Sequence, residues 1–534
     1  MISSEETEDN NDDLDKKILR NAKTKKIARQ IFFSRSVIVF VTIGVQLGLF
    51  LFFLIHLSNK IEVYLSSSAI LSFGFLIYIS NSHGKNEYKI AWIVPVATFP
   101  LVGITCYLLY HSDTGARKLK KDIRKINRDM ECLLPLKADA ESVLKKYPEI
   151  ENLGKYLFNS GHFSPYENTS VKFYPSGEDV YPDFLKILKS AEKFIFIEFF
   201  IMRVDESWDG ILQILKQKVK EGVEVRVICD GFGTYMVSAA RYQRYLKSLG
   251  IKAKVFNPIH PIVSTPINNR DHRKIVIVDE KYALTGGINI SNDYFNIGKN
   301  KFPYWKDTSI IMHGKAIFDF MRMFLEVWNI GEKKKDNYAD FLNLDYKAAR
   351  TDGLVIPYGD HAFNDEDIAE NVYLDIISNA KKYLYITTPY VVIDNQFLST
   401  LTFAAKRGVD VRVAVPSKPD HLATFCVGKT FLKNLIDNGV KVFIYKKGFL
   451  HAKTVLADGK IATVGSVNLD YRSFYAHFEC GAIMYGSSIL SDIKKDFDSM
   501  FENDCEEMHL ADYKALPWYV RSTGRVIRIF GPLM

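Results

Sequence analysis

His272-Arg-Lys-Ile-Val-Ile-Val-Asp279 and His451-Ala-Lys-Thr-Val-Leu-Ala-Asp458 are two copies of one pattern in a chain of 534 residues. In each copy a lysine follows the histidine at the second position, and an aspartate closes the pattern. β-Branched and apolar residues fill the remaining positions, so each copy predicts a β-strand. Because residues i and i+2 of a strand share a face, each histidine and its lysine should point in the same direction.

A glycine turn and an amide follow each copy at the same offset. The first tail reads Gly286-Gly-Ile-Asn289 and the second reads Gly465-Ser466-Val-Asn468. The apolar segment before each tail predicts a strand that returns from a turn, which would bring each asparagine back beside its histidine. Two imidazoles, two ammonium groups and two amides supplied by a duplicated unit indicate one composite site for a phosphate ester.

A single copy of so short a pattern would be weak evidence, because lysine-rich and aspartate-rich chains contain it by chance. Two copies with matching tails make chance a poor explanation. The alternative that remains is a repeat that kept its fold and lost its chemistry. A degenerate copy usually loses its histidine or its lysine, and this chain retains both in each copy.

The duplication extends upstream of the motifs. Each unit alternates helix-like stretches with short apolar strands bounded by glycine turns, a pattern that predicts an α/β sandwich used twice. We expect two pseudo-symmetric α/β domains, at residues 151–335 and 350–534, that share one active site. The corresponding segments are 187–198 and 376–387, 222–227 and 408–413, 250–256 and 439–443, and the helical stretches 209–220 and 397–406.

Three apolar stretches near the N-terminus predict membrane-spanning helices. Residues 36–59 contain no charged side chain and are long enough to span a bilayer, whereas residues 63–80 are of about the minimum length. Residues 90–110 include prolines, which membrane helices tolerate. We therefore expect a transmembrane helical region at 36–111, preceded by a charged cytoplasmic tail at 1–35.

Both flanks of this region are basic, including the juxtamembrane segment at 112–150. Basic flanks favour the cytoplasm, so either one stretch fails to cross or one flank violates the rule. We favour a multi-pass protein with a cytoplasmic catalytic region. The basic run is either the charged face of a solvated helix or a helix at the level of anionic lipid headgroups. Its residues are Arg117, Lys118, Lys120, Lys121, Arg124, Lys125 and Arg128.

The composition narrows the classes of partner and cofactor. A net charge of +8 suits either anionic lipid or nucleic acid, and the adjacent apolar stretches favour lipid. Six cysteines are scattered without a Cys-x-x-Cys pair, and no His/Asp/Glu cluster has metal-ligand spacing. We therefore expect no metal, no cofactor and no nucleic-acid partner; the sequence contains no signal for an oligomeric state.

The paired motifs and their glycine turns resemble those of the phospholipase D superfamily. The wider context is similar to bacterial cardiolipin synthases from about residue 35 to the end, and the acidic segment 5–15 lies outside the resemblance. These segments carry it: Asn268-Asn-Arg-Asp-His-Arg-Lys274, Ile197-Glu-Phe-Phe-Ile201, Thr388-Pro-Tyr390, Pro416-Ser-Lys-Pro-Asp-His421, Lys89-Ile-Ala-Trp-Ile93 with Pro100 and Gly103, and Gly531-Pro-Leu-Met534.

The resemblance implies catalysis through a phosphohistidine. His272 would be the nucleophile and His451 the general acid and base, roles that suit a side chain whose pKa is near neutral. The phosphoryl oxygens would be held by charged and neutral donors. The expected donors and motif residues are Lys274, Lys453, Asn289, Asn468 and Ser466, with Asp279 and Asp458 as either catalytic or purely structural carboxylates.

A nucleophilic histidine also needs an acceptor on its other ring nitrogen. By resemblance, Glu479 follows His451 at the offset where related enzymes carry such a carboxylate. Asn300 occupies that offset in the first half, a departure for which Asp307 is the candidate substitute.

The resemblance implies phosphatidylglycerol as both donor and acceptor, with cardiolipin and glycerol as products. It also implies location in the bacterial cell membrane, with anionic membrane lipid as partner. Two alternatives stay open: a membrane-anchored phospholipase D-type hydrolase or nuclease that uses the same paired site, and a silent lipid-binding scaffold. The intact motifs argue against the scaffold, and the membrane region argues against the nuclease.

Overall fold

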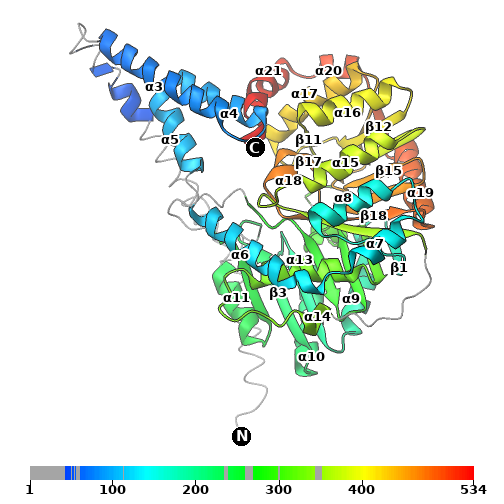
Figure 1. Ribbon diagram of the computed structural model, residues 1–534. Helices are drawn as coiled ribbons and strands as arrows, with labels where there is room; N and C mark the ends of the chain where they lie inside the picture. The colour runs from blue at the N-terminus through cyan, green and yellow to red at the C-terminus, as the bar shows by residue number, and fades with distance from the viewer. Residues whose placement is uncertain are drawn as a thin grey trace.

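Two α/β domains lie side by side, and an arm of helices projects from them (Figure 1). The computed structural model describes residues 43–49, 51–52, 55, 61–111, 114–233, 239–258, 269–298, 301–342 and 352–533. The charged tail 1–35, most of the apolar stretch 36–59 and Asn300 lie outside these residues.

The first domain contains a mixed sheet of seven strands. Both histidine motifs were expected to form strands, and here the motif strand β5 occupies the centre, between β2 and its hairpin partner β6, and it is antiparallel to both. The order is β1 (Thr169–Tyr174), β8 (Ser309–Gly314), β6 (Tyr282–Gly286), β5 (Lys274–Val278), β2 (Phe194–Phe199), β3 (Glu224–Asp230) and β4 (Lys252–Phe256).

The second domain repeats this order and adds one strand at the edge. Its motif strand β15 again lies between a parallel-sheet strand, β10, and its own hairpin partner, β16. The duplicated α/β fold predicted from the motifs is therefore confirmed. The order is β9 (Leu354–Asp360), β18 (Glu479–Tyr485), β16 (Ile461–Gly465), β15 (Thr454–Ala457), β10 (Tyr383–Thr387), β12 (Asp410–Pro416), β13 (Lys441–Tyr445) and β19 (Cys505–Met508).

Helices cover both sheets and one of them joins the domains. Helix α13 (Ile317–Asn329) is buried on nearly every side, because it packs on β5, β6 and β8 of its own sheet and also on β9 of the other. Helix α19 (Ile489–Asn503) makes the reciprocal contact with β1. The covering helices are α9 (Gly177–Lys189), α10 (Glu206–Lys220), α11 (Ala239–Ser248), α15 (Ile368–Asn379), α16 (Asn395–Lys406) and α17 (Leu422–Asp437).

The expectation that residues 90–110 form one spanning helix is wrong. The chain forms α4 (Asn86–Thr98) and α5 (Pro100–His111), separated at Phe99, which has φ −134° and ψ 79°. A residue that precedes proline is disfavoured in the α region, so Pro100 ends one helix and starts the next. The two helices pack closely, since a Cβ on Gly103 would lie 2.5 Å from the backbone nitrogen of Val96.

The preceding helix, α3 (Ile61–Asn81), contains the predicted second span. Across the described parts of the chain, no helix combines the length and the apolarity needed to cross a membrane.

A buried ionic cluster attaches the helical arm to the second domain. Lys85, between α3 and α4, contacts the carboxylates of Glu370 and Asp394, and its ammonium group donates to the Tyr475 hydroxyl at 2.7 Å. The C-terminal turn η4 (Arg528–Leu533) packs against α4 at the same junction. The arm is therefore held close to helix α18 (Tyr471–Tyr475), which lies directly before a strand of the candidate site.

The basic run forms helix α6 (Thr114–Met130) (Figure 1). Its apolar side chains Ile123, Ile126 and Met130 are buried, and the helix packs against α13. Most of its basic side chains are exposed on the opposite face. Because the apolar face is already covered by protein, this helix can offer a lipid surface its charge but not its apolar residues.

Candidate active site

The two motifs meet at the boundary between the domains, and each histidine is held there by the other domain. The His272 backbone N–H donates to the Phe478 carbonyl oxygen at 2.9 Å. The His451 backbone N–H donates to the Lys306 carbonyl oxygen at 2.7 Å. The short strands β14 (Phe449–Leu450) and β7 (Trp305–Lys306) pair beside the second contact. The interface therefore sets the positions of both histidines.

The orienting carboxylates cross between the domains. Nδ1 of His272 lies 2.9 and 3.0 Å from the two carboxylate oxygens of Glu479, and Nδ1 of His451 lies 2.6 Å from Asp307 Oδ2. Both carboxylates are fully buried. A carboxylate on Nδ1 holds the ring proton there and leaves the Nε2 lone pair for chemistry. Each half of the chain thus orients the catalytic candidate of the other half.

Glu479 and Asp307 are equivalent positions of the repeat. Gly465 of β16 pairs with Gly481 of β18, and Gly286 of β6 pairs with Ser309 of β8. Glu479 and Asp307 each lie two residues before the residue that pairs with the glycine. Counting from the histidine points instead to Asn300, because the loop before β7 is longer in the first domain. Among the described residues, Asp307 is the carboxylate that contacts the His451 imidazole.

The residues that follow the two glycines support these carboxylates differently. The Ser466 hydroxyl donates to Glu479 Oε2, while the Cys480 backbone N–H donates to the same hydroxyl oxygen at 3.0 Å. At the equivalent Gly287, a Cβ would lie 2.1 Å from Asp307 Oδ1. In the first domain Asp307 therefore lies where a side chain at Gly287 would be, and in the second domain the Ser466 hydroxyl forms a hydrogen bond with Glu479.

Both motif lysines are buried beside their histidines. The ammonium groups of Lys274 and Lys453 donate to the backbone carbonyl oxygens of His272 and His451. Burial lowers the pKa of Lys274 to about 8 and that of Lys453 to about 7. Lys453 Nζ also lies 2.7 Å from His451 Nδ1; because that nitrogen gives its proton to Asp307, the ring cannot accept a bond from the lysine there.

The surroundings of both imidazoles disfavour their protonated forms. Burial, followed by the charge of Lys453, lowers the pKa of His451 to about 4, and burial together with Lys274 lowers the pKa of His272 well below its usual value. A bound anion would reduce the repulsion between the ammonium groups of Lys274 and Lys453, and it would raise the pKa values of the imidazoles and lysines around it. The site is therefore suited to bind an anion.

The two asparagines that follow the glycine turns are both buried. Asn289 accepts a bond from the Ile201 backbone N–H on its side-chain oxygen at 3.0 Å. Within the described residues its amide nitrogen has no partner, and the side-chain oxygen of the buried Asn468 also has none. An unpaired buried polar group is costly, so the Asn289 amide nitrogen is suited to donate to an oxygen of a bound phosphoryl group, whereas the Asn468 oxygen can only accept a hydrogen bond.

The motif aspartates lie at the opposite ends of the motif strands. Asp279 and Asp458 have φ values of 50° and 55°, and each carboxylate accepts bonds from three successive backbone N–H groups in the neighbouring segment. Those segments are 192–194 and 381–383, where β2 and β10 begin. The geometry places both aspartates in a strand-to-turn connection rather than beside the imidazoles.

Replacing Asp279 by alanine is therefore expected to lower stability rather than turnover per folded molecule. The variant loses an acceptor for three N–H groups and places a non-glycine, non-Asx residue at positive φ, a combined cost of about 3 kcal/mol. Chemical denaturation followed by fluorescence measures the loss. Asp279→Asn, which tolerates the left-handed conformation, is the control and should lose less; a folded Asp279→Ala protein without activity would contradict the structural role.

His477 is a site residue that sequence reasoning missed. Its ring centroid is 5.5 Å from that of His272, and its Nδ1 lies 3.7 Å from Glu479 Oε1. Burial lowers its pKa to about 4. Donor atoms of His272, His477 and Glu479 lie within 4.8 Å of one another, a grouping compatible with a metal. The only sequence signal was its place two residues before Glu479, on the same face of an extended segment.

Arg273, the variable residue inside the first motif, anchors this half of the site. It is almost fully buried, its Nε donates to Glu198 Oε1 at 2.7 Å and its terminal nitrogen donates to the Met323 carbonyl oxygen at 3.1 Å. The pair ties the histidine segment to β2 and α13.

Comparisons with known proteins agree with this geometry. A family model described as the phospholipase D-like domain of cardiolipin synthase matches residues 184–322 and again 373–501, together half of the chain. An uncharacterised protein of Streptococcus mutans is 42% identical over 466 residues, which are 86% of this chain and all of that protein. The cardiolipin synthase of Halalkalibacterium halodurans is 30% identical over 471 residues, or 87% of this chain and 92% of the relative.

A solved structure has the same fold. The phosphatidylserine synthase of Haemophilus influenzae superposes with a TM-score of 0.53 at 15% identity, over 68% of this chain and 93% of that protein. At this identity the likeness concerns the arrangement of strands and helices alone.

Proposed function

Since the chain belongs to the cardiolipin synthase family of phospholipase D-like enzymes, we propose that it condenses two phosphatidylglycerol molecules into cardiolipin and glycerol through a phosphohistidine. The observation that carries this proposal is the reciprocal pair of buried imidazoles, each oriented by a carboxylate of the other domain. Such a pair provides a nucleophile and a separate acid–base group on opposite sides of one phosphorus atom.

In the first half-reaction, Nε2 of His272 attacks the phosphorus of the donor lipid. The bond between phosphorus and the glycerol headgroup oxygen breaks, and His451 gives a proton to that oxygen. The anionic phosphodiester raises the pKa of His451 when it binds, so the imidazole takes up the required proton from the solvent. Lys274, Lys453 and Asn289 hold the non-bridging oxygens as charge develops on them.

In the second half-reaction, His451 takes the proton from a headgroup hydroxyl of the acceptor lipid. The resulting oxygen attacks phosphorus, the bond to His272 breaks, and cardiolipin leaves. Glu479 stabilises the charge that His272 carries while it is phosphorylated, and Asp307 does the same for protonated His451. The cycle returns both imidazoles to their starting state.

The decisive test is lipid analysis of the full-length protein in phosphatidylglycerol micelles. Wild-type protein should form cardiolipin and glycerol, and a His272→Ala/His451→Ala double variant should form neither. Formation of phosphatidic acid without cardiolipin would show that the protein is a hydrolase and not a synthase. Product that persists in the double variant would mean that the paired histidines are not the catalyst.

The rate should fall as pH rises above neutrality. Lys453 and Lys274, with pKa values lowered to about 7 and about 8, lose the charge that holds the phosphoryl oxygens. The value of kcat/KM should therefore decline about tenfold per pH unit between pH 7 and 8, where Lys453 loses its proton, and up to about a hundredfold per unit above pH 8, where Lys274 loses its proton as well, with no loss between pH 7 and 5. Lys453→Arg is the control. Because its guanidinium keeps the positive charge, its kcat/KM should begin to fall at a higher pH than that of the wild type. A fall that begins at the same pH would contradict this assignment.

The basic helix α6 should contribute to binding at an anionic lipid surface. Lys118, Lys121 and Lys125 are exposed, and replacing all three by glutamine should weaken binding to phosphatidylglycerol vesicles by about 3 kcal/mol at low salt. Co-sedimentation at rising salt measures the effect, which screening should erase.

The matched control for this helix replaces three exposed lysines elsewhere on the first domain, Lys186, Lys189 and Lys220, by glutamine. Equal weakening by both triple variants would mean that net charge alone, and not the position of α6, attracts the protein to the vesicles.

A further inference from the structure

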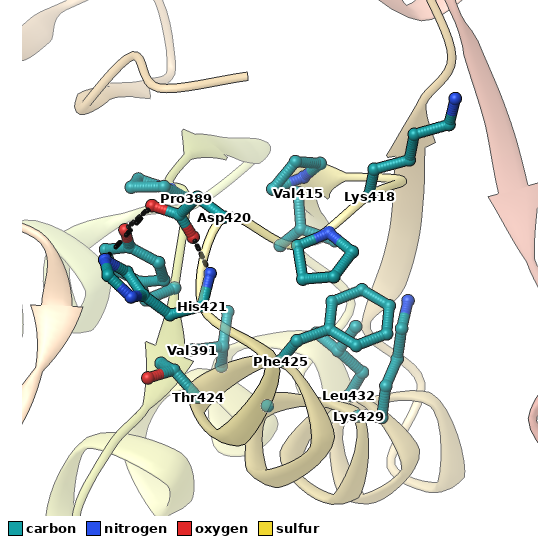
Figure 2. A pocket seen from close by; sticks show the side chains of 14 residues that line it. Pro389, Val391, Val415, Lys418, Asp420, His421, Thr424, Phe425, Lys429 and Leu432 are labelled. Atoms are coloured by element: carbon teal, nitrogen blue, oxygen red, sulfur yellow. Dashed lines mark hydrogen bonds and ion pairs between the residues drawn. The ribbon is translucent and has the colours of Figure 1, made fainter. Parts of the chain in front are cut away.

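A pocket opens in the second domain (Figure 2). Two loops and the first half of α17 form it, and its walls include apolar side chains such as Val391, Val415 and Leu432. Figure 2 shows Phe425 and Lys429 extending together from α17 into this region. The pocket thus combines an apolar wall with a cation.

Lys429 is the unusual member of this lining. Its side chain is only 6% exposed, and among the described residues it forms no ion pair; its ammonium group lies 4.7 Å from the centre of the Phe425 ring. Lys433, one turn further along the same helix, pairs with Asp437 in the ordinary way. A buried ammonium group without a carboxylate is unfavourable, so it indicates a ligand of negative charge.

The charge on Lys429 is available near neutral pH. Burial, together with repulsion by Lys446, lowers its pKa to about 8. The group is therefore mostly protonated at pH 7, and it would hold its proton more firmly once an anion lies beside it.

The pocket borders the acid–base side of the catalytic centre. Tyr390 and Asp420 form its wall there, and the Tyr390 hydroxyl donates to the Asp420 carboxylate. The charge of Asp420 acts on Lys453 and on Tyr294, and the Tyr294 ring lies 5.2 Å from that of His451. The Tyr390–Asp420 wall is therefore the side of the pocket that is electrostatically coupled to the surroundings of His451, the histidine that handles the acceptor hydroxyl.

Helix α17 and the neighbouring helix α21 (Trp518–Ile527) carry exposed apolar residues. Leu422, at the start of α17, is 69% exposed. Helix α21 packs along α17 and exposes Trp518 and Tyr519. Aromatic and aliphatic side chains of this kind favour contact with lipid chains at a membrane surface.

We propose that this pocket binds the acceptor lipid, with Lys429 pairing with the phosphodiester of the second phosphatidylglycerol. The inference rests on the proposed function and assigns the lipid that receives the phosphatidyl group. In phosphatidylglycerol a short glycerol bridge joins the phosphate to the attacking hydroxyl, so a phosphate held by Lys429 directs that hydroxyl toward His451. The apolar wall and the exposed residues of α21 accommodate the acyl chains.

The first test needs no activity. An amine-reactive reagent is applied to wild-type protein in neutral detergent, and modification of Lys429 relative to Lys433 is followed by peptide mass spectrometry. Phosphatidylglycerol should slow modification of Lys429 about tenfold, and phosphatidylcholine or inorganic phosphate should not. No protection, or equal protection by phosphatidylcholine, overturns the anion subsite; equal protection by inorganic phosphate overturns the lipid as its occupant.

The second test separates acceptor from donor. Lys429→Met should raise the KM for phosphatidylglycerol in cardiolipin formation about tenfold while leaving the rate of phosphohistidine formation unchanged; Lys433→Met should change neither. Thermal unfolding checks folding, and Lys429→Met should melt no lower than wild type because it removes an unpaired buried charge. An unchanged acceptor KM overturns the proposal. If wild-type protein makes no cardiolipin, the proposed function fails, and the labelling result still decides the subsite.

Discussion

Replacing His272 by alanine is expected to abolish cardiolipin formation, with a loss of at least about 10⁴-fold in turnover. The variant has no atom that can form the covalent phosphatidyl intermediate, and water or the acceptor hydroxyl cannot replace a buried, carboxylate-oriented imidazole. Headgroup-labelled and acyl-labelled phosphatidylglycerol measure both products. Residual transfer within a hundredfold of wild type would contradict a nucleophilic role for this residue.

The same experiment distinguishes the two histidines. His451→Ala should also lose turnover, yet it retains the nucleophile, so acyl-labelled lipid should become attached to the protein in an acid-labile form. His272→Ala should carry no label. The opposite labelling pattern would mean that His451 is the nucleophile and His272 the acid–base group, an assignment that the near-symmetry of the site allows.

Replacing Glu479 by glutamine, or Asp307 by asparagine, is expected to lower kcat by about 10²- to 10⁴-fold with little change in KM. Each amide keeps the shape of the side chain but removes the negative charge that stabilises a cationic imidazole ring. The bonds at 2.9 and 2.6 Å are made across the domain boundary. Steady-state kinetics with increasing phosphatidylglycerol separates kcat from KM.

Ser466→Ala is the matched control for this pair of variants. It removes the hydroxyl that donates to Glu479 and leaves the carboxylate on His272, so its loss should be smaller than that of Glu479→Gln. Circular dichroism and thermal unfolding confirm folding in each case. A glutamine variant with wild-type kcat would show that charge on this carboxylate is unimportant for the chemistry.

Much of the fold could be predicted because its signals are local and occur twice. Alternating β-branched residues in the motifs predicted β5 and β15, and the helical stretches 209–220 and 397–406 fall inside α10 and α16. One failure concerns residues 90–110, where hydropathy suggested a single span. An apolar composition does not show whether a segment forms one continuous helix, and here Pro100 divides the segment into two helices that pack together.

The sequence indicated many of the residues of the candidate site, but it did not indicate which of them contact one another. The offset counted along the chain falls on Asn300 in the first half, and Asp307 was named as the candidate substitute. Asp307 lies at the His451 imidazole, because loop length varies between the halves while strand register is preserved. His477 and Lys429 carried no recognisable pattern. Their significance depends on burial and on missing partners, and both are properties of packing.

The sequence by itself determined the duplicated α/β unit, the two histidines and lysines, and the carboxylates available to orient them, because short-range periodicity and spacing encode strands and the residues on their faces. Only the tertiary structure decided which carboxylate serves which histidine. The partners are 207 and 144 residues apart, and each pair crosses the domain boundary. Contacts of that separation arise when two sheets pack against each other, and no local pattern in the chain specifies them.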